Sequence, residues 1–256
     1  MGLVQLADKM KFSKNYLKKF IPQMNLKKIS IEGQKKILNA KIVVIGLGGI
    51  GTPFLTYICR AGISNIGIVD HDKVTLSNLH RQIMFYSKDL NKRKTVSVKS
   101  KINQIDKNIK VKIFNKKISK KNIKNIIKEY DYVIDGTDNL STKLLINDEC
   151  KKQKKHLFIG AVSQLEGHIF YFDFKKNYSC LRCFMPSKPK LSVRCQDEGI
   201  LGTVTGVVGI LIANEVLKVI TNNKSQLLNN ILVINFEKLS FRQAKINRRL
   251  TCKHAK

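Results

Sequence analysis

Polar side chains of the types that bind phosphates and metal ions are concentrated just after an apolar run that ends at Val69. They are Asp70, Asp72, Ser77, Asn78 and Arg81. Asn78 and Arg81 are three residues apart, so one helical turn would place them on the same face. A guanidinium group offers a planar fork for phosphate oxygens, and Lys94 would add a further positive charge. The stretch predicts one wall of a nucleotide site.

A glycine-rich turn lies upstream of this stretch. Gly46, Gly48 and Gly51 form the pattern G-x-G-x-x-G, with Gly49 as an additional glycine. Such a turn lets the backbone approach a phosphate, which then lies at a helix N-terminus. Asp70 follows Gly51 by 19 residues, the separation at which an acidic residue commonly binds a ribose hydroxyl. The turn predicts a nucleotide-binding site but does not distinguish NAD from ATP as the ligand. The alternative is a turn that serves only the packing of the helix on the strand.

A third carboxylate, Asp138, ends the predicted strand YVIDGTD and suits the magnesium ion that accompanies a triphosphate. Each of these side chains alone would fit a surface group or a helix cap equally well. Together, a guanidinium, a lysine, an amide and a metal-binding acid favour ATP. A dehydrogenase is the rival enzyme class. It would also need a nicotinamide site and a hydride-transfer partner, and the segment SNLHRQ offers neither.

The elements that must position these groups alternate between strands and helices. We expect strands at 40–45, 65–70, 111–115, 132–138, 156–162, 167–174 and 231–237, and helices at 52–62, 91–106, 119–129, 140–152 and 201–221. This order predicts an α/β fold: a doubly wound, mostly parallel Rossmann-like sheet with helices on both faces, plus a C-terminal antiparallel portion. Ligands bind such sheets outside the carboxyl ends of the strands. We interpret residues 1–38 as a basic helical leader, packed on the domain or on a second subunit, and residues 39–256 as one domain.

The net charge of +30, from 48 Lys and Arg against 18 Asp and Glu, is extreme. Such a charge fits a nucleic-acid binder, but the cations are mostly lysines scattered along the chain, with only eight arginines. We therefore favour a compositionally biased genome over a nucleic-acid groove. A basic surface would also steer an acidic protein partner. The apolar run at 199–220 carries Asn214, Glu215 and Lys218 near its end, so we expect a buried helix and no membrane span. No signal peptide is evident.

In their order along the chain, these motifs resemble the ThiF/MoeB/HesA adenylyltransferases, which are relatives of the ubiquitin-activating enzymes. The matching segments are VVIGLGGIG, IVDHDKVTLSNLHRQ, DGTDN, EGHIFYF, CLRC and CQDEGILGTVTGVVG, and the resemblance covers about residues 12–254. It implies a homodimer that uses ATP and Mg²⁺ to adenylate the C-terminal Gly-Gly carboxylate of a small ubiquitin-like sulfur carrier, releasing pyrophosphate.

Carried over motif by motif, the resemblance assigns the nucleotide site to Gly49, Asp70, Ser77, Asn78, Leu79, His80, Arg81, Lys94, Asp138 and Asn139. Asp70 would bind the ribose, Arg81 with Lys94 and Asn78 the phosphates, and Asp138 the magnesium. The carboxylate of the carrier attacks the α-phosphate directly, so positioning and charge neutralisation can supply the rate. Arg81, Asp138 and Cys195 are the catalytic candidates. Cys195 matches a position that some members use for covalent transfer, with a loop cysteine near the site as the alternative.

The family also implies a structural Zn²⁺ site. Cys180 and Cys183 form one C-x-x-C pair and Cys252 supplies a third ligand, but Ala255 occupies the position expected for the fourth. His254 is a candidate substitute, because zinc accepts three cysteines and one histidine. The alternative is a degenerated site with leftover thiols. Cys59 and Cys150, in helical apolar contexts, are expected to be core thiols.

A second departure concerns the family's N-terminal arginine, which reaches the ATP site of the partner subunit. Lys18 falls at that position here and keeps the charge without the fork. The motifs do not choose between molybdopterin and thiamin biosynthesis, nor exclude a small peptide acceptor or a nucleic-acid binder on a vestigial nucleotide fold. We expect no rhodanese-like extension after residue 256, and therefore a sulfur donor that is a separate protein. The thiols suit a cytoplasmic location or a plastid stroma.

Overall fold

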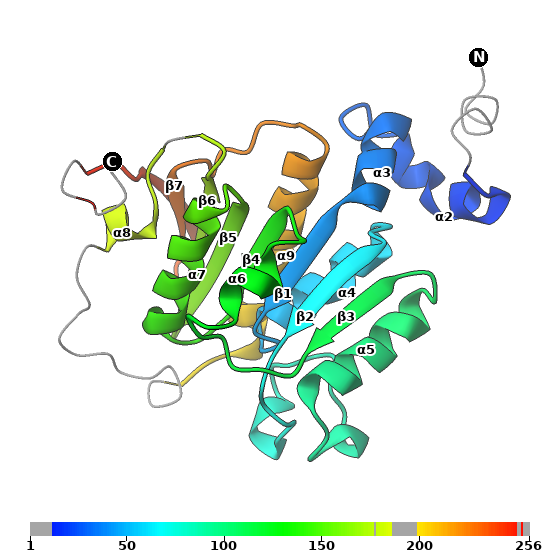
Figure 1. The fold of residues 1–256 in the computed structure, drawn as a ribbon, viewed down its shortest axis with the longest axis horizontal. Coiled ribbons are helices and arrows are strands. Elements are labelled where there is room, and N and C mark those ends of the chain that lie inside the picture. Colours follow the sequence, from blue (N-terminus) through cyan, green and yellow to red (C-terminus); the bar gives the residue numbers. More distant parts are fainter. Residues whose placement is uncertain (1–11, 177, 186–198, 250–251, 253–256) are drawn as a thin grey trace.

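The computed structural model describes residues 12–176, 178–185, 199–249 and 252, and they form one large sheet covered by helices (Figure 1). The strands are β1 (Lys41–Ile45), β2 (Asn65–Val69), β3 (Lys110–Phe114), β4 (Tyr132–Asp135), β5 (His156–Ser163), β6 (Glu166–Asp173), β7 (Asn230–Asn235) and β8 (Ser240–Lys245). Their spatial order is β3-β2-β1-β4-β5-β6-β7-β8. The first five are parallel and the last three continue antiparallel. The predicted fold class is confirmed.

Helices lie on both faces of the sheet (Figure 1). They are α2 (Lys14–Met24), α3 (Ser30–Asn39), α4 (Gly51–Arg60), α5 (Lys94–Ile105), α6 (Ile123–Ile127), α7 (Leu140–Lys152), α8 (Leu181–Phe184) and α9 (Gly202–Ile220). Side chains alternate across a strand, so Ile42 and Val44 of β1 join the core under α4, α5 and α9. Val43 and Ile45 join the core under α6 and α7. Two apolar layers thus hold β1 rigidly beneath the glycine turn.

Helix α9 is long and apolar enough to cross a membrane by length and composition. Half of its most apolar stretch is buried in the molecule, where it packs against α4, β5 and β6. The run at 199–220 therefore contains a core helix, as the sequence predicts.

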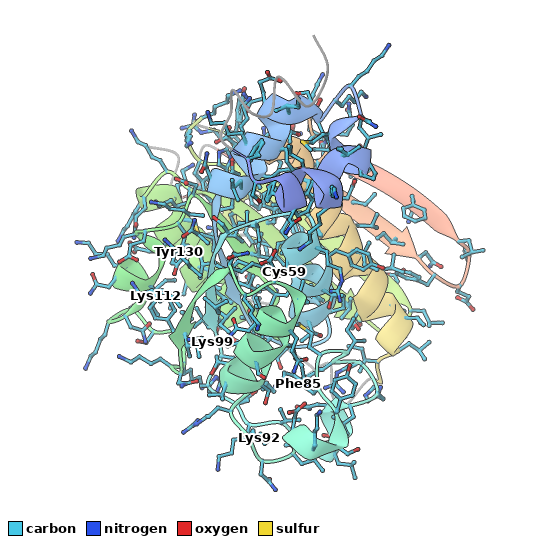
Figure 2. All side chains as sticks on the ribbon, turned by 90° about the vertical axis from the view of Figure 1, so that its right-hand side faces the viewer. Cys59, Phe85, Lys92, Lys99, Lys112 and Tyr130 are labelled. Atoms are coloured by element: carbon cyan, nitrogen blue, oxygen red, sulfur yellow. The ribbon has the colours of Figure 1, made fainter. Side chains whose placement is uncertain are left out.

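The surface is basic and the core thiols are inert. Lys92 and Lys112 project outward near α5 and β3, whereas Cys59 lies inside (Figure 2). Burial raises the pKa of the Cys59 thiol to about 12, and Cys150 is buried as well. Both cysteines are core thiols, as predicted.

The N-terminal helices α2 and α3 pack against each other through their own small apolar cluster. Gln34 of α3 donates from Nε2 to the Ala61 carbonyl oxygen (3.0 Å) and to the Tyr16 hydroxyl (2.9 Å). Because α3 leads directly into β1, both helices lie at the amino end of that strand. The division of the chain at residue 38 stays a prediction.

One strand ends earlier than predicted, and one strand was not predicted at all. The strand expected at 132–138 ends at Asp135, because the backbone N–H and hydroxyl of Thr137 both donate to Asp135 Oδ1 and turn the chain out of the sheet. Strand β8 was not predicted, and nearly all of its side chains are exposed. An exposed strand lacks the apolar alternation on which the prediction depends.

Candidate active site

A cavity of about 470 Å³ opens where β1, β2, β4 and β5 end. Its walls come from the glycine turn, the segment after β2, the first residue of α5, the loop after β4 and the start of α9. Eight of the predicted nucleotide-site residues line it: Gly49, Asp70, Ser77, Asn78, Arg81, Lys94, Asp138 and Asn139. The fold therefore brings motifs that are far apart in sequence into one hollow.

The glycine turn is packed too tightly for a side chain at Gly46, at Gly49 or at Gly51. Gly46 has a φ of +92°, and a Cβ there would lie 2.8 Å from the carbonyl carbon of Gly136. A Cβ on Gly51 would lie 2.1 Å from the carbonyl oxygen of Gly46. The contact of Gly46 with Gly136 packs the turn after β1 against the turn after β4, and the contact of Gly51 with Gly46 closes the glycine turn on itself.

Replacing Gly51 with alanine is expected to destabilise the fold by about 1–3 kcal/mol, the usual cost of forcing atoms into a packed site. Gly206 of α9 is the matched control, because a Cβ there would meet nothing within 4 Å. Gly206→Ala should be stabilising by about 0.5–1 kcal/mol through helix propensity. Urea denaturation measures both variants. Equal stability of the two would show that the turn is looser than these contacts require.

Asp70 fixes the segment after β2 to the glycine turn. Its Oδ2 accepts a bond from the Leu47 backbone N–H at 2.8 Å, and its Oδ1 accepts one from the Asp72 N–H at 2.8 Å. Each carboxylate oxygen can accept a further bond, so Asp70 is oriented by the protein and still able to bind a ribose hydroxyl.

Lys94 is the first residue of α5 and is only 5% exposed. Its ammonium group lies 3.2 Å from Oδ2 of Asp72, which is exposed. This contact holds the lysine at the wall of the cavity. The sequence prediction named Lys94 but gave Asp72 no such role.

Asn78 and Arg81 are adjacent on one turn, as predicted. Asn78 ends the short 3-10 helix η1 (Leu76–Asn78), and the Arg81 N–H donates to its carbonyl oxygen at 3.1 Å. Arg81 Nη1 also donates to the Ser77 carbonyl oxygen at 2.8 Å. Arg81 has five N–H donors, so most of its fork stays available to a phosphate.

Two residues of the predicted set do not line the cavity. Leu79 packs against the apolar core, and His80 is exposed with its Nε2 2.6 Å from Arg81 Nη1. Their neighbours Asn78 and Arg81 do line it, because successive residues of a tight turn point in different directions.

Asp138 is exposed in the loop between β4 and α7 and does not end a strand. The predicted placement at a strand end was wrong, because the chain leaves the sheet at Asp135. Asp138 still lines the cavity. The next residue, Asn139, is the N-cap of α7 and accepts a bond from the Thr142 N–H at 2.9 Å. The loop thus presents a carboxylate beside a helix N-terminus, where a phosphate is also favoured.

Sequence reasoning missed a buried ion pair behind this loop. Asp135 is fully buried, and the Lys143 ammonium lies 3.4 Å from its Oδ1 and donates to the Gly160 carbonyl oxygen at 2.8 Å. Lys143 also lines the cavity. Nothing distinguishes Lys143 from the many other lysines of the sequence. Only the bend after Asp135 brings the two side chains together.

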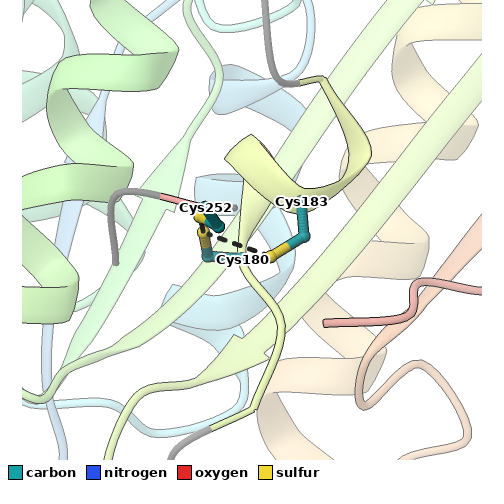
Figure 3. A group of neighbouring side chains, drawn as sticks. All are labelled: Cys180, Cys183 and Cys252. Carbon is teal, nitrogen blue, oxygen red and sulfur yellow. Dashed lines mark hydrogen bonds between the residues drawn. The ribbon is translucent and has the colours of Figure 1, made fainter. Parts of the chain in front are cut away.

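The three predicted cysteine ligands lie close together, although Cys180 and Cys252 are 72 residues apart in the chain (Figure 3). The sulfur of Cys180 lies 3.9 Å from that of Cys183 and 3.8 Å from that of Cys252. Four sulfurs at 2.3 Å around a tetrahedral zinc ion would be about 3.8 Å apart, so the spacing fits such an ion. Burial raises the pKa of the Cys180 thiol, and the adjacent sulfurs raise it further.

Three predicted residues cannot be placed at either site. Cys195, His254 and Ala255 lie outside the described residues. Lys18 is described and is exposed on α2, but it does not line the cavity of its own chain.

A family model described as the ThiF family matches residues 20–254. The chain belongs to the ThiF family. Relatives of this ThiF chain include the "Adenylyltransferase and sulfurtransferase MOCS3" of Anopheles gambiae, 34% identical over 94% of this chain and 55% of that protein. The "Sulfur carrier protein adenylyltransferase" of Thermus thermophilus is 31% identical over 95% of this chain and 92% of that protein.

The chain thus spans about half the length of the mosquito relative and almost all of the bacterial one. Its fold matches that of E. coli MccB solved with MccA-N7isoASN, with a TM-score of 0.83 at 20% identity, covering 96% of this chain and 75% of MccB. This match agrees with the fold described above.

Proposed function

We propose that this ThiF chain is an ATP-dependent adenylyltransferase that activates the C-terminal Gly-Gly carboxylate of a small ubiquitin-like sulfur carrier. The observation that carries the proposal is one cavity that combines a phosphate-binding glycine turn with Arg81, Lys94 and the exposed carboxylate of Asp138. A nicotinamide site would not need these groups. The names of the relatives in mosquito and Thermus agree with this reaction.

In the proposed reaction, Asp70 holds the ribose of ATP, and the glycine turn with Arg81 and Lys94 holds the triphosphate. A carboxylate oxygen of the carrier attacks the α-phosphorus. The bond from that phosphorus to the bridging oxygen of the β-phosphate breaks, and pyrophosphate leaves with the electron pair. The product is an acyl-adenylate. No protein nucleophile takes part, so the protein accelerates the step by alignment and by neutralising charge.

Asp138 is the residue that would hold the magnesium ion of the triphosphate. Its oxygens are the hard ligands that Mg²⁺ prefers, and its one bond within the described residues is a long one, 3.4 Å, from the Asn139 side chain. A bound magnesium ion would neutralise phosphate charge. Zinc would be structural, held by Cys180, Cys183 and Cys252, since three thiols at this spacing fit its geometry.

The partner in this proposal is an acidic carrier, which a protein of charge +30 would attract over a distance. The working unit is a homodimer. Lys18 is exposed on α2 and does not line the cavity of its own chain, and in this proposal it contributes its charge to the site of a second copy. The pathway is molybdopterin or thiamin biosynthesis, and the compartment is the cytoplasm or a plastid stroma.

Intact-mass measurement of the carrier tests the reaction. After incubation with the protein, ATP and Mg²⁺, the carrier should gain the mass of one adenylyl group, and hydroxylamine should remove it. A carrier that lacks its final glycine should gain nothing. Modification of an internal side chain, resistant to hydroxylamine, would contradict activation of the C-terminus.

A further inference from the structure

The carboxylate that would bind magnesium is not itself held in place. Asp138 is exposed, and within the described residues its carboxylate accepts only the long 3.4 Å bond from the Asn139 side chain. A metal-binding carboxylate usually depends on outer contacts that fix its orientation. The position of Asp138 must therefore be set by the backbone of its loop, residues 136–139, which connects β4 to α7.

A single buried carboxylate oxygen binds this loop and the helix that follows it. Asp135, the last residue of β4, is fully buried. Its Oδ1 accepts bonds from the N–H and the hydroxyl of Thr137, inside the loop, at 2.9 and 2.7 Å. The same oxygen lies 3.4 Å from the ammonium group of Lys143, near the start of α7. Asp135 thus ties the loop to β4 on one side and to α7 on the other.

Lys143 connects this arrangement to the rest of the sheet. Its Nζ also donates to the Gly160 carbonyl oxygen in β5 at 2.8 Å, and α7 packs on both β4 and β5. The Lys143 side chain is only 10% exposed, and a lysine is almost never buried unless it is paired. One ammonium group therefore fixes the start of α7, and with it the N-cap residue Asn139.

Asp135 depends on this cation in turn. Its Oδ2 is buried and makes no hydrogen bond within the part of the chain that the structure describes, and Lys143 is its ion-pair partner there. A buried carboxylate without an opposite charge beside it is very unfavourable. Without the ammonium group, an uncompensated charge would lie directly behind the loop, and the chain would shift to bring Asp135 into contact with water.

We propose that Lys143 is a positioning residue for Asp138. By tying the start of α7 to Asp135 and to β5, it fixes the loop that presents the Asp138 carboxylate to the magnesium ion of ATP. This inference rests on the proposed function, in which Asp138 holds that ion. Because Lys143 also lines the cavity, the experiment has to separate this role from a direct contact with a phosphate of ATP.

The test compares variants of the full chain. Lys143→Met alone would leave Asp135 buried without a cation, so it is expected to fold poorly. The double variant Asp135→Asn, Lys143→Met removes both charges, and the Asn oxygen can still accept the bonds from Thr137. Asp135→Asn alone is its reference. The control is Lys151→Met on the same helix, because Lys151 donates to the Tyr178 carbonyl oxygen at 3.3 Å but does not line the cavity.

Calorimetric titration of ATP without a carrier, with and without Mg²⁺, measures the role. Mg²⁺ should tighten ATP binding in wild type, in Asp135→Asn and in Lys151→Met. The double variant should bind ATP normally without Mg²⁺, but its affinity with Mg²⁺ should fall about 10-fold below that of Asp135→Asn. Its residues 136–142 should also exchange amide hydrogens faster. In an Asp138→Ala background the double change should cause no further loss of affinity, because effects that act through one residue are not additive.

Three results would overturn the inference. Weaker ATP binding by the double variant without Mg²⁺ would make Lys143 a direct phosphate contact. Faster amide exchange with an unchanged response to Mg²⁺ would make the pair structural only. ATP binding by wild type that does not respond to Mg²⁺ would remove the metal from Asp138. Failure of wild type to activate any Gly-Gly carrier would instead remove the proposed acceptor, and the response to Mg²⁺, measured without a carrier, would still decide the role of Lys143.

Discussion

Replacing Arg81 with alanine is expected to lower kcat of carrier-dependent ATP–pyrophosphate exchange by about 100- to 1,000-fold at saturating ATP. Arg81 lines the cavity beside the glycine turn, and its Nη1 is held by the Ser77 carbonyl oxygen. A guanidinium group that is already in position can stabilise the negative charge that moves from the α-phosphate to the leaving pyrophosphate. Because this charge develops in the transition state, the loss should fall on kcat and not merely on ATP affinity.

Arg60 provides a matched control for this substitution. Its Nη1 donates to the Thr56 carbonyl oxygen at 2.8 Å, the same i−4 contact at the same length that Arg81 makes, but on an exposed face of α4. Arg60→Ala should therefore leave exchange unchanged. Arg81→Lys should retain part of the activity, because the charge remains while the fork is lost. An Arg81→Ala variant with normal turnover at saturating ATP would remove Arg81 from the reaction.

Removing zinc is expected to lower the melting temperature by about 10 °C, corresponding to a few kcal/mol for a domain of this size. A bound zinc ion would link Cys180 and Cys183, at the start of α8 and within it, to Cys252, and the described cysteines form no disulfide. Purified protein should contain one zinc ion per chain by elemental analysis. Cys180→Ala should lose both the zinc and the stability.

Cys150→Ala is the control for the zinc experiment. Cys150 is fully buried in the same apolar cluster as Cys180 but stands apart from the three sulfurs. The variant should lose a little packing energy and keep its zinc. Protein that carries no metal, and whose melting temperature a chelator leaves unchanged, would identify the cysteines as leftover thiols.

The local parts of the site could be predicted from sequence. The glycine turn, Asp70 and the Asn78–Arg81 turn each depend on short spacings within one loop, and their residue types restrict what they can bind. The sheet could be predicted from apolar runs that alternate with helical patterns. The structure has a strand at each of the five runs predicted to be parallel. Strand β8 could not be predicted, because its exposed side chains show no apolar alternation.

The parts that depend on packing between distant segments could not be predicted. The contact of Lys143 with Asp135 requires the bend after β4, and Lys143 has no feature of its own in a lysine-rich chain. Gln82 is one residue from Arg81, but its burial beside Gly48 follows only from the fold. Leu79 and His80 were included with their neighbours, although the turn directs them away from the cavity.

ATP–pyrophosphate exchange is the most direct measurement of the central claim. Purified protein, ATP, Mg²⁺ and labelled pyrophosphate would be incubated with separate sulfur carriers that end in Gly-Gly. We predict exchange that requires a carrier and stops when its last glycine is removed, and the carrier that works identifies the pathway. ATP binding without exchange for any Gly-Gly carrier would contradict adenylation of a sulfur carrier by this chain.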